Sequence, residues 1–485
     1  MIDAMIWVIL IPLLGGVVAV LFPRIAGLTG IFSAAAMLLA SLALLKLIAD
    51  TGPQVYLIGG WSAGLGISLY ADGLSSLLLL MTAMIALAVS IYASSYFRHS
   101  HLRQHYWPLW LLLLSALAAL LLAADLFNIY VTLELLGISA VALTALDGKK
   151  PALDAAVRYL VLGLLGSLAF LAGVALLYIG YGSLDMATLA TRIQPSAASW
   201  AAASLMTAGL LIKTALFPMH FWLPPAHANA PAPVSAALSA LVVKAAFYLV
   251  LRLWLDLFGI SLSGWTSILI GLLGAAAVLW GSWCALQAER LKVLAAYSTV
   301  AQIGYLFIFL ALILEMPDGI PRTEAIAGLM LLALSHGFAK SAFFLSAGVI
   351  QKLHGHDRIN ELAGAAQGMP VTTFTLALAG VSLIGLPISG AFLGKWQLIE
   401  GALYLHHWML VLAVIAGSLL ASAYVFRILG QAFGQSPYPT KPLSIGMQEI
   451  PAMALALIAT LVLGLASGPV WPFLEATVVS GRGGL

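Results

Sequence analysis

Charged residues are scarce in this 485-residue chain, since Asp, Glu, Lys and Arg make up 8% of it and hydrophobic residues 62%. Soluble proteins carry about 25% charged residues, so a surface this poor in charge faces lipid rather than water. The single cysteine, Cys284, excludes an internal disulfide and a cysteine-based metal cluster. A formal net charge of +3 does not favour a nucleic-acid partner. The composition therefore predicts an integral membrane protein.

Apolar stretches long enough to cross about 30 Å of hydrocarbon recur along the whole chain. About fourteen transmembrane helices are expected, in one polytopic domain of residues 1–485. The first stretch has no basic segment before it and no small-residue cleavage pattern after it, so we expect a retained helix. The predicted spans are 4–22, 27–49, 73–97, 108–124, 127–146, 157–181, 199–218, 234–258, 263–284, 292–314, 325–350, 371–405, 408–432 and 449–472.

Two of these spans are predicted to be broken helices. The seventh runs through Lys213 into a segment with five prolines between Pro218 and Pro233, and each proline removes a backbone donor. The twelfth contains GLPISG at 385–390, followed by Lys395. Non-helical backbone at membrane depth is tolerated where it lines a wet cavity, so both breaks indicate an ion path.

The spacing of the broken spans predicts an internal repeat. Spans seven and twelve are five apart, so they cross the membrane in opposite directions, which is typical of inverted repeats. We expect helices 1–3 in 1–107, a first five-helix repeat in 108–258, a second in 263–432 and a last helix in 449–472. The alternative is two unrelated kinks.

The loop charges predict an orientation, because cytoplasmic loops carry an excess of Lys and Arg. Ten basic residues fall on one face and five on the other, which places both termini outside the cytoplasm. The two sets are Arg24, Arg98, Arg103, Lys149, Lys150, Arg290, Lys292, Lys352, Arg358 and Lys441 against Lys46, Arg192, Arg252, Arg322 and Arg482.

Six ionisable residues lie far from the predicted ends of their spans: Glu134, Lys213, Lys244, His336, Lys340 and Lys395. Each isolated charge at that depth costs several kcal/mol, so such residues usually mark an ion path. The competing explanation is that each lysine snorkels to a headgroup or forms a structural ion pair. A desolvated lysine can exchange its proton near neutral pH, and histidine can relay protons. A carboxylate about 4 Å away at an effective dielectric of about 20 contributes about 4 kcal/mol, so Glu134 could control the proton on Lys213.

Four segments resemble the antiporter-like membrane subunits shared by respiratory complex I, membrane-bound hydrogenases and Mrp-type cation/proton antiporters. They are DLFNIYVTLE ending at Glu134, the run from Lys213 to Arg252, SHGFAKSAFFL at 335–345 and SGAFLGKWQLI at 389–399. Within that family, DLFNIYVTLE and GGWSAGLGISLYADGLSS at 59–76 look most like the D subunit of the Mrp antiporters.

The resemblance implies a fourteen-helix core with broken helices seven and twelve, and proton translocation by the six ionisable residues. Glu134 matches the helix-five glutamate, and Lys213 and Lys244 match the lysines of helices seven and eight. His336 and Lys340 match the helix-eleven pair, and Lys395 matches the helix-twelve position. It also implies other membrane subunits as partners, protons and Na⁺ as the transported ions, and the cell membrane as the location.

Two functions remain open from the sequence. One is a subunit of a secondary transporter that exchanges protons for Na⁺ or another monovalent cation. The other is the proton-pumping subunit of a complex I-like NADH:quinone oxidoreductase or a membrane-bound hydrogenase. A lone haem or quinone carrier is disfavoured because paired in-membrane histidines are lacking. We expect no cofactor and no metal site, since His220 and His227 have no partner pattern, and no enzyme active site within the chain.

Overall fold

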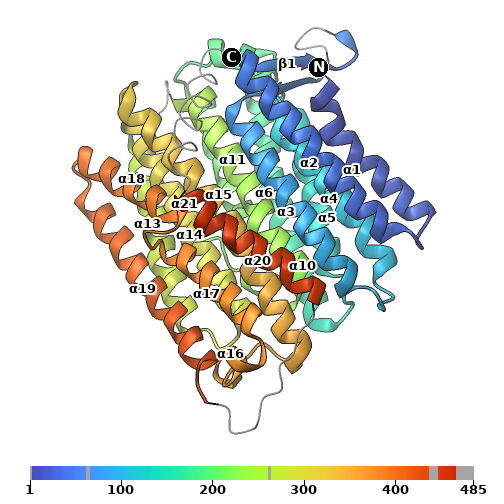
Figure 1. Cartoon of the computed structure of the whole chain (residues 1–485). Helices are drawn as coiled ribbons and strands as arrows, with labels where there is room; N and C mark the ends of the chain where they lie inside the picture. The colour runs from blue at the N-terminus through green and yellow to red at the C-terminus, as the bar shows by residue number, and fades with distance from the viewer. Residues whose placement is uncertain (1–2, 62–65, 260–263, 436–445, 466–485) are drawn as a thin grey trace.

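The protein is a bundle of long apolar helices with one small β-hairpin (Figure 1). The computed structural model describes residues 3–61, 66–259, 264–435 and 446–465. Within these residues, twelve helices are long and apolar enough to cross a membrane, and two shorter apolar helices belong to the broken spans. The expected helical membrane fold of about fourteen spans is therefore confirmed. The predicted start at 263 and end at 472, and the charges of Lys441 and Arg482, lie outside the described residues.

The first six spans are followed by a short helix, α7 (Met186–Arg192). An antiparallel hairpin of β1 (Gln54–Leu57) and β2 (Ser68–Ala71) joins the second span to the third, with a short turn η1 (Ile58–Gly60) between the strands. The sequence did not predict this hairpin. The six spans are α1 (Asp3–Leu21), α2 (Ala26–Thr51), α3 (Gly73–Tyr96), α4 (Arg103–Leu122), α5 (Leu126–Thr144) and α6 (Lys150–Tyr181).

Aspartates set the starts of two of these helices. Asp72 accepts the backbone N–H of Ser75, whose hydroxyl accepts from the Asp72 N–H, so α3 begins with a capping box. Asp125, outside the span, accepts the N–H groups of Phe127 and Asn128 and caps α5. Burial raises the pKa of Asp125 above its usual range, although these N–H groups favour its charged form. The cap fixes the start of the helix that carries Glu134.

The seventh span breaks where the prolines predict. Its first half, α8 (Ala197–Lys213), ends at the lysine, and its second part, α9 (Leu223–Asn229), has prolines in its first turn. Pro231 and Pro233 then begin the eighth span, Ala232–Phe258, which consists of α10 (Ala232–Ala237), η2 (Leu238–Val242), α11 (Val243–Arg252) and η3 (Leu253–Phe258). The parts η2 and η3 are π-helical. Lys213 therefore stands at a helix end.

The twelfth span breaks at GLPISG. The helix α17 (Pro370–Ile384) ends at Gly385, which has φ +82°, a left-handed conformation that suits glycine. Ser389 then caps α18 (Gly390–Tyr404) by accepting the N–H of Phe392. Lys395 lies in the second turn of α18, so it faces the end of α17.

The remaining elements complete the second half of the chain. Short helices and turns occupy the connections, and the last described span is divided by a π-helical turn. The elements are α13 (Trp265–Gln287), α14 (Leu291–Glu315), α15 (Ile320–His354), η4 (Ile359–Glu361), α16 (Ala365–Gly368), α19 (Trp408–Ala432), η5 (Gly446–Gln448), α20 (Glu449–Leu457), η6 (Ile458–Val462) and α21 (Leu463–Leu465).

The helices are arranged from one edge of the bundle to the other roughly in chain order. In Figure 1, α1 and α2 lie toward the right edge, α15 lies in the middle, and α18 and α19 lie at the left edge. The apolar stretches of α15 and of the eighth span are buried throughout, whereas only 33% of those in α1 and α2 is buried. Large side chains such as Leu28 and Phe32 are exposed there, as expected for a lipid or subunit contact.

Glycines allow the broken spans to pack closely. A Cβ added at Gly209 of α8 would lie 2.2 Å from the carbonyl oxygen of Gly166 in α6. A Cβ at Gly394 of α18 would lie 2.9 Å from the carbonyl oxygen of Gly328 in α15. Small residues at these crossings bring the backbones together, as is usual between transmembrane helices. They place Lys213 against α6 and Lys395 beside α15.

Two basic residues that the charge count assigned to loops are buried instead. Arg252, at the end of α11, lies 2.6 Å from Asp72 and 2.9 Å from Asp256, and its guanidinium stacks over the ring of Tyr70. Lys292 lies in the first turn of α14 and is 2% exposed. Treating them as loop charges was wrong, because both lie near helix ends in sequence but are covered by neighbouring elements.

Candidate functional site

Glu134 and Lys213 form an ion pair. The Lys213 Nζ lies 3.2 Å from Glu134 Oε1, and the side chains of Lys213 and Glu134 are 9% and 19% exposed respectively. The hydroxyl of Ser167 in α6 donates to the same oxygen. The pair thus joins α5, α6 and α8 and lines a narrow lateral groove between Gly137, Gly163 and Val242. Glu134, which the sequence suggested as the ion-pair partner of Lys213, forms that ion pair in the structure.

Lys244 is buried in α11 without a carboxylate partner among the described residues. Its Nζ donates to the carbonyl oxygen of Ser239 at 3.2 Å, within the π-helical turn η2. Such turns change the local hydrogen-bond pattern and often occur at functional sites. The Ser239 hydroxyl shares a hydrogen bond of 2.7 Å with the hydroxyl of Thr299 in α14.

Lys340 and His336 lie one turn apart on the buried helix α15. The Lys340 Nζ donates to the carbonyl oxygen of Ala295 at 2.7 Å and to the hydroxyl of Ser298, both in α14. Both ring nitrogens of His336 lack a hydrogen-bond partner among the described residues. The ring is close enough to Lys244, Lys340 and Lys395 for their charges to act on it. A buried imidazole without protein partners is a position for water.

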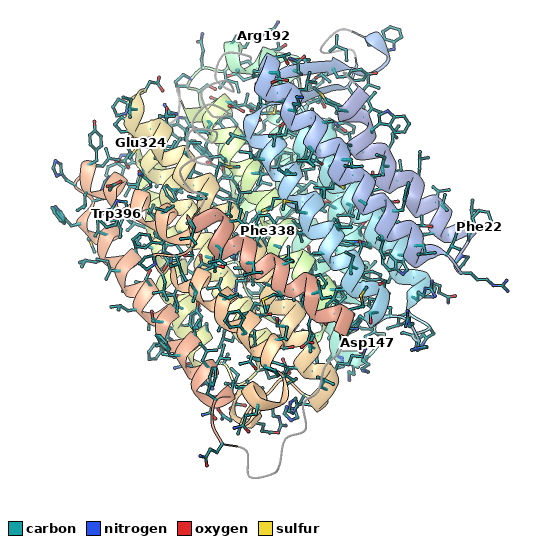
Figure 2. The ribbon with its side chains drawn as sticks, viewed as in Figure 1. Phe22, Asp147, Arg192, Glu324, Phe338 and Trp396 are labelled. Carbon is teal, nitrogen blue, oxygen red and sulfur yellow. The ribbon has the colours of Figure 1, made fainter. Side chains whose placement is uncertain are left out.

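Lys395 is held by the end of the preceding half-helix. Its Nζ donates to the carbonyl oxygen of Ile384 at 2.9 Å and to the Ser418 hydroxyl of α19 at 3.1 Å. It also lies 4.4 Å from the ring centre of Tyr305. The last carbonyls of a helix have no intrahelical partner and carry partial negative charge, so they stabilise an ammonium. Figure 2 shows its neighbour Trp396 at the outer edge of the bundle, whereas Lys395 itself is 4% exposed.

One face of α14 connects these lysines, and the sequence analysis missed it. Ala295 and Ser298 accept hydrogen bonds from the Lys340 ammonium. Thr299 shares a hydrogen bond with Ser239, whose carbonyl accepts from Lys244. The ring of Tyr305 lies against the Lys395 ammonium. The side-chain amide of Gln302 donates to the Leu383 carbonyl, which also accepts from Lys395 at 3.4 Å. Polar residues at 298, 299, 302 and 305 repeat with helical spacing in an otherwise apolar helix, and that spacing was the available signal.

The row of lysines crosses the bundle and is interrupted between Lys213 and Lys244. It runs from α5 and α8 through α11 and α15 to α18. In Figure 2, Phe338, which lies between His336 and Lys340 in sequence, is near the middle of the bundle. No hydrogen bond or ion pair joins Lys213 to Lys244 among the residues that the structure describes. The six predicted residues therefore form two groups, the Glu134–Lys213 pair and a second group of Lys244, His336, Lys340 and Lys395.

Cavities lie at opposite ends of the bundle. One of about 470 Å³ is lined by Asp147, Lys149, Arg290, Lys292 and Lys352. Another, of about 620 Å³, is lined by Glu324, Gln397 and Glu400, close to Lys395 in α18. Figure 2 shows Asp147 at one end of the bundle and Glu324 and Arg192 at the other. The first cavity is rich in basic side chains, and the second has acidic ones.

The comparisons with known proteins identify the family. The model of the NADH:quinone oxidoreductase/Mrp antiporter transmembrane family matches residues 123–421, a range that contains all six predicted site residues. The chain belongs to this family, and the resemblance inferred from its motifs is confirmed.

Two relatives and one solved structure of the same fold cover nearly the whole chain. It is 34% identical over 454 residues to NADH-quinone oxidoreductase subunit N of Desulforudis audaxviator, covering 90% of this chain and 88% of that protein. It is 30% identical over 477 residues to the Na⁺/H⁺ antiporter D subunit of Bacillus subtilis, covering 96% and 94%. A chain of the Mrp complex from Dietzia sp. has the same fold, with a TM-score of 0.89, 24% identity and coverage of 98% and 96%.

Proposed function

We propose that this chain is the proton-translocating subunit of a multi-subunit antiporter that exchanges protons for a monovalent cation, Na⁺ being the first candidate. The observation that carries the proposal is the Glu134–Lys213 ion pair together with a row of buried lysines that have no carboxylate partner among the residues that the structure describes. Similarity to the D subunit of a Na⁺/H⁺ antiporter supports the same function.

The proposed role of the pair is to control a proton on Lys213. The Glu134 carboxylate, at 3.2 Å, favours the ammonium form over the neutral amine, since a carboxylate at this range contributes about 4 kcal/mol at an effective dielectric of about 20. When Glu134 moves away, Lys213 releases its proton toward Lys244. His336, Lys340 and Lys395 then pass charge along α14, with water bridging the gaps that side chains leave.

The proposed proton route joins the two cavities. The predicted inverted repeats, 108–258 and 263–432, each contain one broken span and would each supply one half of the route. By the excess of Lys and Arg, the cavity beside Asp147 faces the cytoplasm. Both termini then lie on the extracytoplasmic side of the cell membrane.

Other membrane subunits are proposed as partners. The Glu134–Lys213 pair opens into a lateral groove beside exposed apolar residues such as Ile138 and Leu164. An ion pair of this kind is costly against lipid, so a neighbouring subunit would cover it. The isolated chain in liposomes should therefore not exchange cations for protons. Full exchange by the chain alone would contradict the proposed partnership.

A second candidate function is redox-driven proton pumping, which the similarity to a subunit N favours. The same residues would serve either function. Everted membrane vesicles that contain the complete complex separate the two, with a pH-sensitive dye as the readout. An antiporter dissipates an imposed pH gradient when Na⁺ or K⁺ is added, and a complex without this chain does not. A redox pump instead creates a pH gradient when NADH or hydrogen is oxidised, and adding Na⁺ or K⁺ does not change that gradient.

A further inference from the structure

The basic cavity leads inward to Lys292. It lies between α3, α6, the segment after α9, α14 and α15. Four cationic side chains line it, Lys149, Arg290, Lys292 and Lys352, against the carboxylate of Asp147. Lys292 is 2% exposed, and its Nζ donates to the carbonyl oxygen of Ala230 at 2.5 Å. It therefore forms part of the buried inner wall of the cavity.

The acidic neighbour of Lys292 is engaged elsewhere. Asp357 accepts the Arg290 Nε–H at 2.8 Å and the backbone N–H of Lys292 at 3.2 Å. No carboxylate bonds to the Lys292 ammonium among the described residues. The ammonium is held by a neutral carbonyl, so it can release a proton without separating from an anion.

His227 lies near both Lys292 and Lys340. It is fully buried at the end of the first break, its ring stacked on that of Phe344 at a centroid distance of 4.7 Å. Neither ring nitrogen has a hydrogen-bond partner among the described residues. The charges of Lys340 and Lys292 both act on this ring. A buried nitrogen without any partner is costly, so each ring nitrogen offers a position where water can bind.

The helix α14 sets the spacing between the two lysines. Lys292, Ala295 and Ser298 are three residues apart and share one face of the helix. Ala295 and Ser298 bind the Lys340 ammonium. Six residues rise about 9 Å along a helix, a gap that an imidazole and a few waters can bridge.

We propose that the basic cavity, Lys292 and His227 form an entry limb that carries protons, and not monovalent metal cations, to Lys340. In each transfer His227 takes a proton on one ring nitrogen and releases one from the other, so the ring returns to its neutral form. A metal cation would meet four cationic side chains in the lining and a single carboxylate, that of Asp147, and like charge repels it. The cation must then cross elsewhere. This inference rests on the proposed function.

The test of Lys292 uses the complete complex in everted vesicles, where the cavity face is outside. The background variant is Cys284→Ser, so that Lys292→Cys carries the only thiol of this chain. We expect Lys292→Cys to lower the exchange rate at least about tenfold at normal abundance. Aminoethyl methanethiosulfonate, which attaches a primary amine, should restore much of it, and neutral methyl methanethiosulfonate should not. Equal restoration by both reagents, or undiminished exchange in Lys292→Cys, would overturn the limb.

The test of His227 uses chemical rescue. His227→Ala should lose exchange, and imidazole added on the cavity side should restore part of it, because residues 228–231 line the cavity. His101→Ala, at an exposed histidine, is the matched control and should behave as wild type. If His227→Ala does not accumulate, His227→Gln takes its place and should also lose exchange. Normal exchange in the variant that accumulates would remove His227 from the limb.

Two further measurements distinguish failure of the proposed entry limb from failure of the proposed antiport function. The Na⁺ concentration for half-maximal exchange should stay unchanged in Lys292→Cys while the maximal rate falls, and a large increase would place the cation in the limb. Glu134→Gln tests the proposed function independently. If Glu134→Gln is inactive but the Lys292 and His227 variants are active, the limb is wrong and the proposed function stands. If Glu134→Gln is fully active, the proposed function itself fails.

Discussion

The Lys395 ammonium lies 2.9 Å from the carbonyl oxygen of Ile384, so the second half of the broken twelfth span binds the end of its first half. Lys213, at the corresponding break of span seven, binds a carboxylate instead. The two lysines thus differ in what stabilises their charge. The Lys213 ammonium depends on the carboxylate of one side chain, whereas the Lys395 ammonium is held by the backbone carbonyls that end α17 and by the Ser418 hydroxyl.

Replacing Lys395 tests the α14 row at its far end. Lys395→Ala should lower exchange at least about tenfold, although it is far from Glu134, because a charge-carrying position is lost. Lys395→Arg should remain inactive, since arginine does not release its proton. The exchange rate of both variants is measured in everted vesicles from the response of the pH-sensitive dye to added cation. Lys150→Ala, at an exposed lysine, is the control, and wild-type exchange in Lys395→Ala would remove Lys395 from the path.

Gly209 tests the close helix crossing that positions Lys213. Gly209→Ala should reduce the amount of folded protein, because the added Cβ would lie 2.2 Å from the Gly166 carbonyl oxygen. Overpacking of this kind costs about 1–3 kcal/mol. The melting temperature of the purified complex measures the effect. Gly180→Ala is the matched control in α6, since a Cβ added there would have no atom within 4 Å. Equal stability of the two variants would contradict the crossing.

Arg252 tests the ionic cluster at the end of α11. Arg252→Gln leaves Asp72 and Asp256 buried without their cation, and breaking a buried pair in this way costs about 3–5 kcal/mol. We expect low abundance and a lower melting temperature. Arg98→Gln, at an exposed arginine, should change neither. A stable Arg252→Gln variant with wild-type melting would show that the cluster contributes little to folding.

Much of the fold could be predicted from residues with strong local effects. The proline cluster after Lys213 and the GLPISG segment located both breaks, because successive prolines remove several backbone donors and Gly385 adopts the left-handed conformation that ends a helix. The Glu134–Lys213 pair could be predicted because an unpaired charge inside a membrane helix is costly, so two opposite charges at this depth are expected to pair. The β-hairpin was missed because its strands have only four residues each, too few for a clear alternating pattern.

Other parts of the site depend on contacts between segments that are distant in sequence. The spacing of Ser298 and Thr299 marks a polar face of α14, but it does not identify Lys340 and Ser239 as the residues that this face binds. Arg252 and Lys292 looked like interface charges because they lie near helix ends. Their burial depends on Asp72 and on the segment around Ala230, both distant in sequence.

The proposed control of the Lys213 proton by Glu134 is tested most directly by cation/proton exchange in the complete complex. The rate is measured for Glu134→Gln, for Lys213→Ala and for wild type. Glutamine keeps the size of the side chain but removes the charge that holds the Lys213 proton. We expect both variants to reach the membrane at wild-type abundance and to show no exchange. Wild-type exchange by either variant would show that the ion pair is structural and would contradict the proposed mechanism.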